Sequence, residues 1–325
     1  MKRRAATSVG AEGIGKTVLE YLAGRFTYHN REQWRERIAA GQVLHNGCPA
    51  LSGAVLGRKD RLEYQIPCEA EPEVDGRFGI LFEDDDLLAV NKPGNLPCHP
   101  AGRYFSHTLW ALLKRTGSIE NPIFINRIDR ETSGVVLVAK NARVARGCRR
   151  QFETRRVVKH YLAIVEGRFP PDAIQADGWL APDPASPVRK KKRFWQAAAT
   201  RVNPPGGRLC RTRVQLYRHC NGLSLVAARP ETGRCHQIRA TLNSLGYPLV
   251  GDKLYGVDDT LFLRFIRGAL SVTDRNRLRL PRQALHAAGL QVVHPVSGRL
   301  LQLEAPLPRD MQSLLTGCRR SSIGS

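Results

Sequence analysis

The pattern of apolar and polar positions divides the chain into a short N-terminal segment and a longer C-terminal one. Helical spacing begins at Thr17, and a second helix is expected at residues 32–40. Residues 41–47 then predict a short strand that enters an Asn-Gly turn. A polar, proline-containing stretch follows, and we place a linker and domain boundary at residues 69–77.

After this boundary, short strands in adjacent hairpins outnumber strand-helix-strand units. Strands are expected at residues 80–83, 87–90, 134–139, 157–166, 210–217, 222–228, 284–294 and 300–304, and helices at 106–114, 141–156, 236–245, 258–267 and 310–315. Ser106 is the expected N-cap of its helix. This order predicts an α+β fold for residues 78–316, with a large mixed, mainly antiparallel sheet and flanking helices. Residues 1–13 and 317–325 are predicted to be tails, the first one basic and flexible.

Charge points to a polyanionic partner. The formal net charge is +22, and the excess of Lys and Arg extends along the whole sequence. Nucleic acid is the first expectation and a membrane surface the competing one. The sequence contains no apolar run near the roughly 18 residues of a spanning helix, no lipidation motif and no secretory signal. We therefore expect no membrane partner and a cytoplasmic location.

The cysteines are scattered and include no Cys-x-x-Cys pair. This spacing argues against a zinc site or a disulfide scaffold, so we expect reduced thiols and no metal. The sequence also lacks a P-loop and a dinucleotide-binding fingerprint, and no cofactor is expected.

Two stretches place basic residues where RNA contacts are plausible. In the proline-rich, irregular region at residues 167–209, Lys190, Lys191 and Lys192 precede two aromatic residues. Cations for phosphate and rings for stacking suit a flexible RNA-clamping loop, and a solvated hairpin tip is the alternative. The helix at 141–156 carries Arg149 and Arg150 among its arginines, for phosphate contact or as a solvated face.

A polar turn within residues 125–138 carries Asp129 between two arginines, and a β-branched run follows it. An Asp in such a position most often shapes the turn through its own side chain. The other interpretation is a positioned catalytic carboxylate.

A resemblance favours the catalytic interpretation. Residues 126–134 resemble the motif His-Arg-Leu-Asp-x-x-Thr-Ser-Gly of the RluA-type pseudouridine synthases, with Asn126 in place of His. Residues 233–239 resemble the family's Gly-Arg-Thr-His-Gln-Ile-Arg, with Cys235 in place of Thr, and residues 251–256 resemble its Gly-Asp-x-x-Tyr-Gly. With shorter matches around them, the resemblance extends over residues 78–308.

The resemblance implies an isomerase that converts uridine in RNA to pseudouridine without a cofactor. Asp129 would start the reaction, either as a nucleophile or by taking a proton from the sugar, and Arg239 would be its ion-pair partner. Tyr161 would stack on the target base, and Arg127 would fill the space that the flipped nucleotide leaves. His236 would brace the pocket. Arg239 and Tyr161 also have structural alternatives, as an internal ion pair and a core tyrosine.

The N-terminal segment, residues 14–68, resembles the S4-type RNA-binding module that is often attached to these synthases. Its arginines Arg31, Arg35 and Arg37 are candidate RNA contacts. A small α+β appendage that touches no RNA is the alternative.

Two other classes of function stay open. A glycoside hydrolase or base-removing glycosylase would need a second carboxylate across the scissile bond, and Glu131 is very close in sequence to Asp129. A non-catalytic RNA-binding protein would explain the charge alone. For the synthase, ribosomal RNA is the favoured substrate and transfer RNA is possible. The sequence indicates no obligate protein partner, and a monomer is expected.

Overall fold

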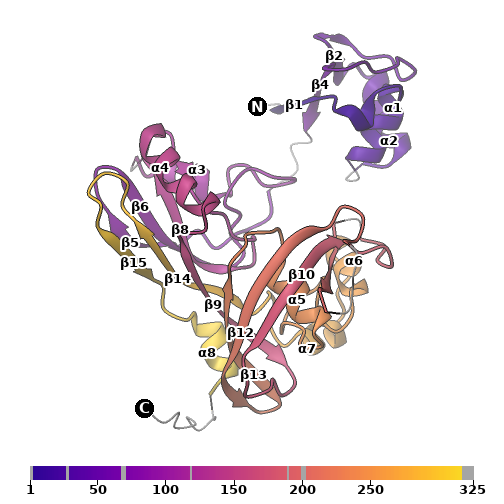
Figure 1. The fold of residues 1–325 in the computed structure, drawn as a ribbon. Helices are drawn as coiled ribbons and strands as arrows, with labels where there is room; N and C mark the ends of the chain where they lie inside the picture. Colours follow the sequence, from indigo (N-terminus) through magenta and orange to yellow (C-terminus); the bar gives the residue numbers. More distant parts are fainter. Residues whose placement is uncertain are drawn as a thin grey trace. The chain divides into compact units, whose positions relative to one another are not determined.

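Two groups of elements make up the computed structural model, and each has its own sheet and core. The structure describes residues 3–26, 29–66, 71–117, 119–188, 190–198 and 203–316. Unit 1 comprises Met1–Ala70 and unit 2 Glu71–Ser325, and both can be followed by their labels in Figure 1. The predicted tail at residues 317–325 lies outside the described residues.

Unit 1 is a four-stranded antiparallel sheet with two helices. The strands are β1 (Arg3–Ser8), β2 (Val43–His45), β3 (Cys48–Pro49) and β4 (Arg61–Ile66), in the order β1-β4-β2-β3. The helices α1 (Val18–Arg25) and α2 (Arg31–Ala39) each begin with a capping box, formed at Thr17 and at Asn30. The caps satisfy backbone N–H groups that lack partners within the helix. Trp34 of α2 is fully buried in the core.

The prediction of a loose tail over residues 1–13 is wrong for the part that the structure describes. Strand β1 pairs with β4 along its whole length, and a short 3-10 turn, η1 (Ala11–Gly13), follows it. The sequence of β1 has no alternation of apolar and polar residues, so local pattern does not predict a strand there. Its strand character comes from its pairing with the distant β4. The predicted helices and the Asn-Gly turn of unit 1 are confirmed. Asn46 and Gly47 both have positive φ, 51° and 87°, as a two-residue hairpin turn requires.

Unit 2 is built on one eleven-stranded sheet. Its main path is β11-β10-β12-β13-β9-β14-β8-β6-β5, with β15 paired to β14 and β7 to β8. The strands are β5 (Gly79–Glu83), β6 (Leu87–Lys92), β7 (Ile123–Phe124), β8 (Ser133–Ala139), β9 (Val158–Glu166), β10 (Ile174–Pro182), β11 (Lys192–Gln196), β12 (Arg208–Cys220), β13 (Leu223–Pro230), β14 (Leu285–Val293) and β15 (Leu300–Glu304). Among these strands every pairing is antiparallel except that of β8 with β14.

Helices pack on the two halves of this sheet. They are α3 (Leu109–Arg115), α4 (Ala142–Glu153), α5 (Gln237–Ser244), α6 (Thr260–Ile266), α7 (Val272–Leu278) and α8 (Arg309–Leu314). Figure 1 shows α3 and α4 beside β6 and β8, and α5, α6 and α7 grouped beside β10 and β12. The α+β fold with a mixed, mainly antiparallel sheet is confirmed. No helix in the described part of the chain combines the length and the apolar character that a membrane crossing needs.

Three local predictions fail in unit 2. The region 167–209, predicted to be irregular, contains β10 and β11, and its prolines lie at or beyond the strand ends. Helix α3 is capped by Thr108 rather than Ser106, because the Thr108 hydroxyl accepts a hydrogen bond from the Ala111 amide in the first turn. Helix α7 has no counterpart in the predictions. It is seven residues long and begins with a capping box at Ser271 and Asp274.

The thiols also differ in part from expectation. Cys220 is disulfide-bonded. Five described cysteines are free thiols: Cys48, Cys98, Cys148, Cys210 and Cys235. The prediction that all thiols are reduced is therefore wrong for Cys220.

The parallel pairing of β8 with β14 brings two distant segments to the same edge of the sheet. Ser133 and Gly134 pair with His286 and Ala287, so the turn before β8 meets the residues before β14. Gly134 has a φ of +113°, and a Cβ at this position would lie 2.2 Å from the Ala287 carbonyl oxygen. The close approach of the two backbones therefore requires glycine.

Gly134→Ala should destabilise unit 2 by about 2–5 kcal/mol, because the methyl group meets both a strained backbone and the neighbouring strand. Thermal unfolding of the variant and the wild type measures the change. Gly117→Ala is the matched control, with a φ of +73° and no atom near its Cβ, and it should cost about 1 kcal/mol. Equal losses in both variants would contradict the close approach at Gly134.

Candidate active site

A tight turn at residues 129–132 holds the carboxylate that the sequence singles out. The Thr132 amide donates to the Asp129 carbonyl over 3.1 Å, and β8 begins at the next residue. Before the turn, Asn126 donates to the Val135 carbonyl (3.2 Å) and accepts from the Leu137 amide (2.7 Å). The asparagine that replaces the family's histidine therefore ties the turn to β8.

A buried lysine supports the same turn from the end of β6. Lys92 has no exposed surface, and its Nζ donates to the carbonyls of Pro93 (2.7 Å) and Arg130 (3.1 Å). Burial lowers the pKa of Lys92 to about 7, because the apolar surroundings disfavour the charged form. Lys92 thus fixes the backbone one residue beyond Asp129.

Arg239 of α5 binds two carboxylates at once. Its Nη1 donates to Asp129 Oδ2 (2.7 Å), while Nε and Nη2 donate to Asp252 Oδ2 (2.7 Å) and Oδ1 (2.9 Å). Asp252 is fully buried, and its Oδ1 also accepts from the amides of Leu254 and Tyr255, both at 2.9 Å. The bidentate pair fixes the plane of the guanidinium, so Nη1 reaches Asp129 from a fixed direction.

Asp129 keeps its negative charge in this setting. Burial raises the pKa of Asp129, but the charge of Arg239 and the hydrogen bonds from Arg239 and Gln283 outweigh it, so the pKa lies below its ordinary value. Gln283 Nε2 lies 3.3 Å from Asp129 Oδ2 and 2.7 Å from Thr132 Oγ1. Both donors use Oδ2. His236 Nε2 lies 4.0 Å from Oδ1, beyond hydrogen-bond distance, and 31% of the Asp129 side chain is exposed. The site therefore presents an ionised carboxylate with one oxygen open.

The surroundings of His236 favour one tautomer of its ring. The Lys192 backbone amide donates to the Tyr255 hydroxyl (2.9 Å), and the same hydroxyl lies 2.9 Å from His236 Nδ1. A hydroxyl that accepts from this amide still has its own proton to offer to Nδ1. Burial, with the charge of Arg239, lowers the pKa of His236 to about 4, so the ring is neutral at pH 7. We expect its proton on Nε2, the nitrogen 4.0 Å from Asp129 Oδ1.

Tyr161 lies on β9 opposite Ala228 and is half-buried against the core that includes Ile238 of α5. Burial raises the pKa of Tyr161 to about 12, and the charge of Asp129 adds to the effect. The side chain is therefore a protonated phenol within the electrostatic influence of Asp129. It packs on the core of unit 2, and its role at the target base stays a prediction.

The other carboxylates close to the turn are bound to cations. Lys253 Nζ lies 3.0 Å from both oxygens of Glu131, and Arg130 Nη2 donates to Oε1 at 2.9 Å. Glu131 is therefore engaged in ion pairs and is not free to act as a second catalytic carboxylate. Within the described residues, no group of three or more His, Cys, Asp and Glu side chains is placed to hold a metal ion.

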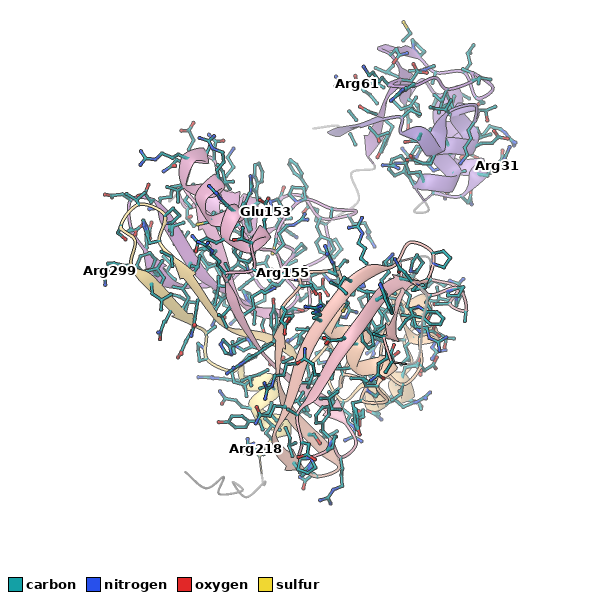
Figure 2. All side chains as sticks on the ribbon, in the orientation of Figure 1. Arg31, Arg61, Glu153, Arg155, Arg218 and Arg299 are labelled. Carbon is teal, nitrogen blue, oxygen red and sulfur yellow. The ribbon has the colours of Figure 1, made fainter. Side chains whose placement is uncertain are left out.

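The basic residues that the sequence proposes for RNA are placed in different surroundings. Arg127 and Arg149 are exposed and line one hollow of about 580 Å³. Arg150, also exposed on α4, does not line it. In unit 1, α2 carries Arg31, which is exposed (Figure 2), Arg35, which pairs with Glu32 at 2.5 Å, and Arg37, which donates to Gln42 at 3.0 Å.

The three lysines between β10 and β11 differ from one another. Lys190 is exposed, and its Nζ lies 4.2 Å from the centroid of the Phe262 ring. Lys191 is only 14% exposed and pairs with Asp259 (3.0 Å) and Asp183 (3.7 Å). Lys192 is half-buried, and its backbone binds Tyr255. The segment is therefore anchored to the rest of unit 2 through Lys191 and Lys192.

Three residues of the site have no role in the sequence analysis. Asp252 and Tyr255 fall within the stretch at 251–256. This stretch matches a family motif, but the match assigns no role to either residue. Gln283 has no signal in the sequence, because it reaches Asp129 only through the parallel pairing of β8 with β14.

Comparison with known proteins agrees with this geometry. Residues 86–244 match the family described as RNA pseudouridylate synthase. Ribosomal large subunit pseudouridine synthase D of Zymomonas mobilis is 31% identical, over 93% of this chain and 94% of that protein. An uncharacterized RNA pseudouridine synthase of Chloroflexus aurantiacus is 35% identical, over 91% and 87%. Among solved structures, human RNA pseudouridylate synthase domain containing 4 has a TM-score of 0.56 at 26% identity, over 73% of this chain and 91% of that one.

The chain therefore belongs to the RNA pseudouridine synthase family, and the RluA-type resemblance is confirmed. It is an isomerase that acts on uridine in RNA.

Tyr255→Phe should slow the conversion of uridine about tenfold under single-turnover conditions, because His236 can then carry its proton on either nitrogen. Nitrogen-15 NMR of the histidines reports the tautomer, and single-turnover kinetics report the rate. Tyr247→Phe is the matched control, since this half-buried tyrosine packs on Phe169 away from His236. A normal rate and an unchanged tautomer in Tyr255→Phe would contradict the assignment.

Lys190 and Lys192 should meet RNA phosphates, whereas Lys191 should not. Changing both Lys190 and Lys192 to Met should flatten the log-log dependence of RNA binding on salt by up to about 1.4–1.8, at about 0.7–0.9 per phosphate. Lys191→Met should leave that slope unchanged and lower the free energy of unfolding by about 1–3 kcal/mol, because Asp259 loses its partner. Filter binding over a salt series and chemical denaturation measure the two effects. A flatter slope in Lys191→Met would contradict this division.

Proposed function

We propose that this protein converts specific uridines of large-subunit ribosomal RNA to pseudouridine and that Asp129 initiates the reaction. The observation that carries the proposal is the shared guanidinium of Arg239, which keeps Asp129 ionised and leaves Oδ1 open. A relative over nearly the whole chain is named for the large ribosomal subunit, and this name supports the choice of RNA. Transfer RNA is the alternative substrate.

The reaction breaks the bond between uracil N1 and ribose C1′, turns the base, and joins C5 to C1′. Asp129 either attacks the ribose carbon or removes a proton from the sugar, and each role requires the carboxylate form. When C5 is joined, its proton must leave. The protonated phenol of Tyr161 can stack on the base and take part in a relay of that proton. His236, as an Nε2–H donor, can hydrogen-bond an oxygen of the detached uracil or of Asp129.

RNA binding would use the surface cations. Arg127 would occupy the space left by the extruded uridine, which lowers the cost of flipping. The arginines of α2 would let unit 1 act as the S4-like module, contributing affinity or choice of site rather than chemistry. We expect the protein to act as a monomer in the cytoplasm.

A glycosylase is the less suitable alternative for this site. Its mechanism would need a second carboxylate free to act across the scissile bond, and Glu131 is bound by Lys253 and Arg130. A glycosylase would also release free uracil, whereas isomerisation leaves the mass of the RNA unchanged. A non-catalytic RNA-binding protein would not need the buried Arg239–Asp252 pair beside Asp129.

Asp129→Asn should abolish conversion, by at least about a thousandfold, while RNA affinity stays within a few-fold of wild type, because the change removes charge and keeps shape. Asp129→Glu keeps the charge but moves the carboxylate by about 1 Å, and should cost on the order of a hundredfold. Pseudouridine mapping in large-subunit ribosomal RNA, single-turnover kinetics and parallel binding measurements test both variants.

Asp172→Asn provides the control for loss of a carboxylate, since Asp172 is exposed and lies outside the site. It should convert uridine as the wild type does. Near-normal conversion by Asp129→Asn would overturn the catalytic assignment. Conversion only in transfer RNA would keep the chemistry and replace the substrate.

A further inference from the structure

A hollow of about 580 Å³ lies next to the catalytic turn, and of its lining residues only Arg127 has a part in the mechanism above. Its lining comes from His99, residues 122–125, Arg127, Arg149, Phe152 and Glu153. Arg127 is two residues from Asp129, and two residues span at most about 7 Å of backbone. The hollow is therefore within reach of an RNA strand whose target uridine lies at Asp129.

The inner wall of the hollow is aromatic and aliphatic. The rings of His99 and Phe124 pack with their centroids 4.3 Å apart, and Phe152 and Ile123 are half-buried beside them. Because Phe124 is only 6% exposed, the rings that this wall offers to a planar group are those of the half-buried His99 and Phe152. Unpaired bases of RNA are commonly held by stacking on aromatic side chains in this way.

The mouth of the hollow carries three charged side chains. Arg127, Arg149 and Glu153 are all exposed, and none of them forms an ion pair with another residue of the described part of the chain. Arg149 and Glu153 lie four residues apart on α4, a spacing at which opposite charges can pair, yet they stay apart. Arginines at the mouth complement a phosphate.

Glu153 is also placed against the usual preference of a helix. It is the last residue of α4, where Figure 2 labels it, and the negative end of the helix dipole disfavours a carboxylate there. A carboxylate that is exposed, unpaired and at the wrong end of its helix gains nothing for stability. It can, however, accept a hydrogen bond from an amino group in the hollow.

We propose that this hollow binds a second, unstacked nucleotide of the substrate RNA, within two positions of the target uridine. The base stacks on the aromatic wall, and its exocyclic amino group donates a hydrogen bond to Glu153. The phosphate of the same nucleotide lies between Arg127 and Arg149. The hollow therefore favours adenine, cytosine or guanine over uracil, which has no exocyclic amino group. The inference rests on the proposed function, since it needs an RNA substrate held at Asp129.

The test uses the full-length protein and a synthetic fragment of large-subunit ribosomal RNA that the wild type converts. Each of the three positions on either side of the target is replaced in turn by an abasic ribose, and then by uracil where another base is native. Single-turnover kinetics give the half-saturating RNA concentration and the limiting rate. One abasic position within two of the target should raise the half-saturating concentration about tenfold and change the limiting rate far less.

Variants of the hollow then separate its parts. Glu153→Gln has both a donor and an acceptor, so it should lose the discrimination against uracil at that position and keep the penalty for the abasic ribose. Arg149→Met should weaken binding of all these RNAs alike and flatten the salt slope by about 0.7. Arg143→Met is the matched control, because Arg143 is exposed on the same helix and does not line the hollow. It should keep the discrimination unchanged.

The inference is overturned if no abasic position near the target raises the half-saturating concentration in the wild type. It is also overturned if Glu153→Gln and the wild type discriminate against uracil equally. Circular dichroism and thermal unfolding confirm that each variant is folded. Failure of the proposed function would look different, because the wild type would then convert none of the unmodified fragments, or Asp129→Asn would convert them normally.

Discussion

The guanidinium of Arg239 is the interaction on which the centre of unit 2 depends. Without it, Asp129 and Asp252 would be two like charges in a largely buried space, and each would tend to take up a proton. With it, Arg239, Asp129 and Asp252 together carry one net negative charge, and this charge lies at the open oxygen of Asp129. Asp252 in turn is held by the amides of Leu254 and Tyr255. The direction of the Asp129 carboxylate is thus set by backbone groups of a distant loop.

The cations of unit 2 fall into two groups with different tasks. Four with little exposure bind carboxylates, namely Arg239, Lys253, Arg282 and Lys191, whereas the buried Lys92 binds backbone carbonyls. These pairs hold α5, the residues before β14 and the β10–β11 connection around the site. The exposed arginines are spread over the surface, and Figure 2 labels two of them, Arg155 and Arg299, in separate parts of unit 2. They supply the general attraction for a polyanion, which the buried pairs cannot, because their charge is already neutralised.

Sequence patterns predicted what local periodicity and motifs determine. Strand β8, strand β9 and helices α4 and α5 follow from the spacing of apolar residues, and Asp129, Arg239 and His236 follow from the motifs. Contacts between distant segments were not predictable in the same way. The strand character of β1 comes from its pairing with β4, and Gln283 reaches Asp129 through the parallel pairing of β8 with β14. Lys191 looks like its neighbours in the sequence, and only the fold places Asp259 against it.

The hydrogen bond from the Lys192 amide to the Tyr255 hydroxyl links the start of β11 to the centre of unit 2. The exposed Lys190 lies two residues before Lys192, and the Tyr255 hydroxyl lies 2.9 Å from His236 Nδ1. A displacement of the chain at Lys192 would therefore change the surroundings of the imidazole without touching it. The backbone of a segment that reaches the surface is thus part of what holds His236 in place.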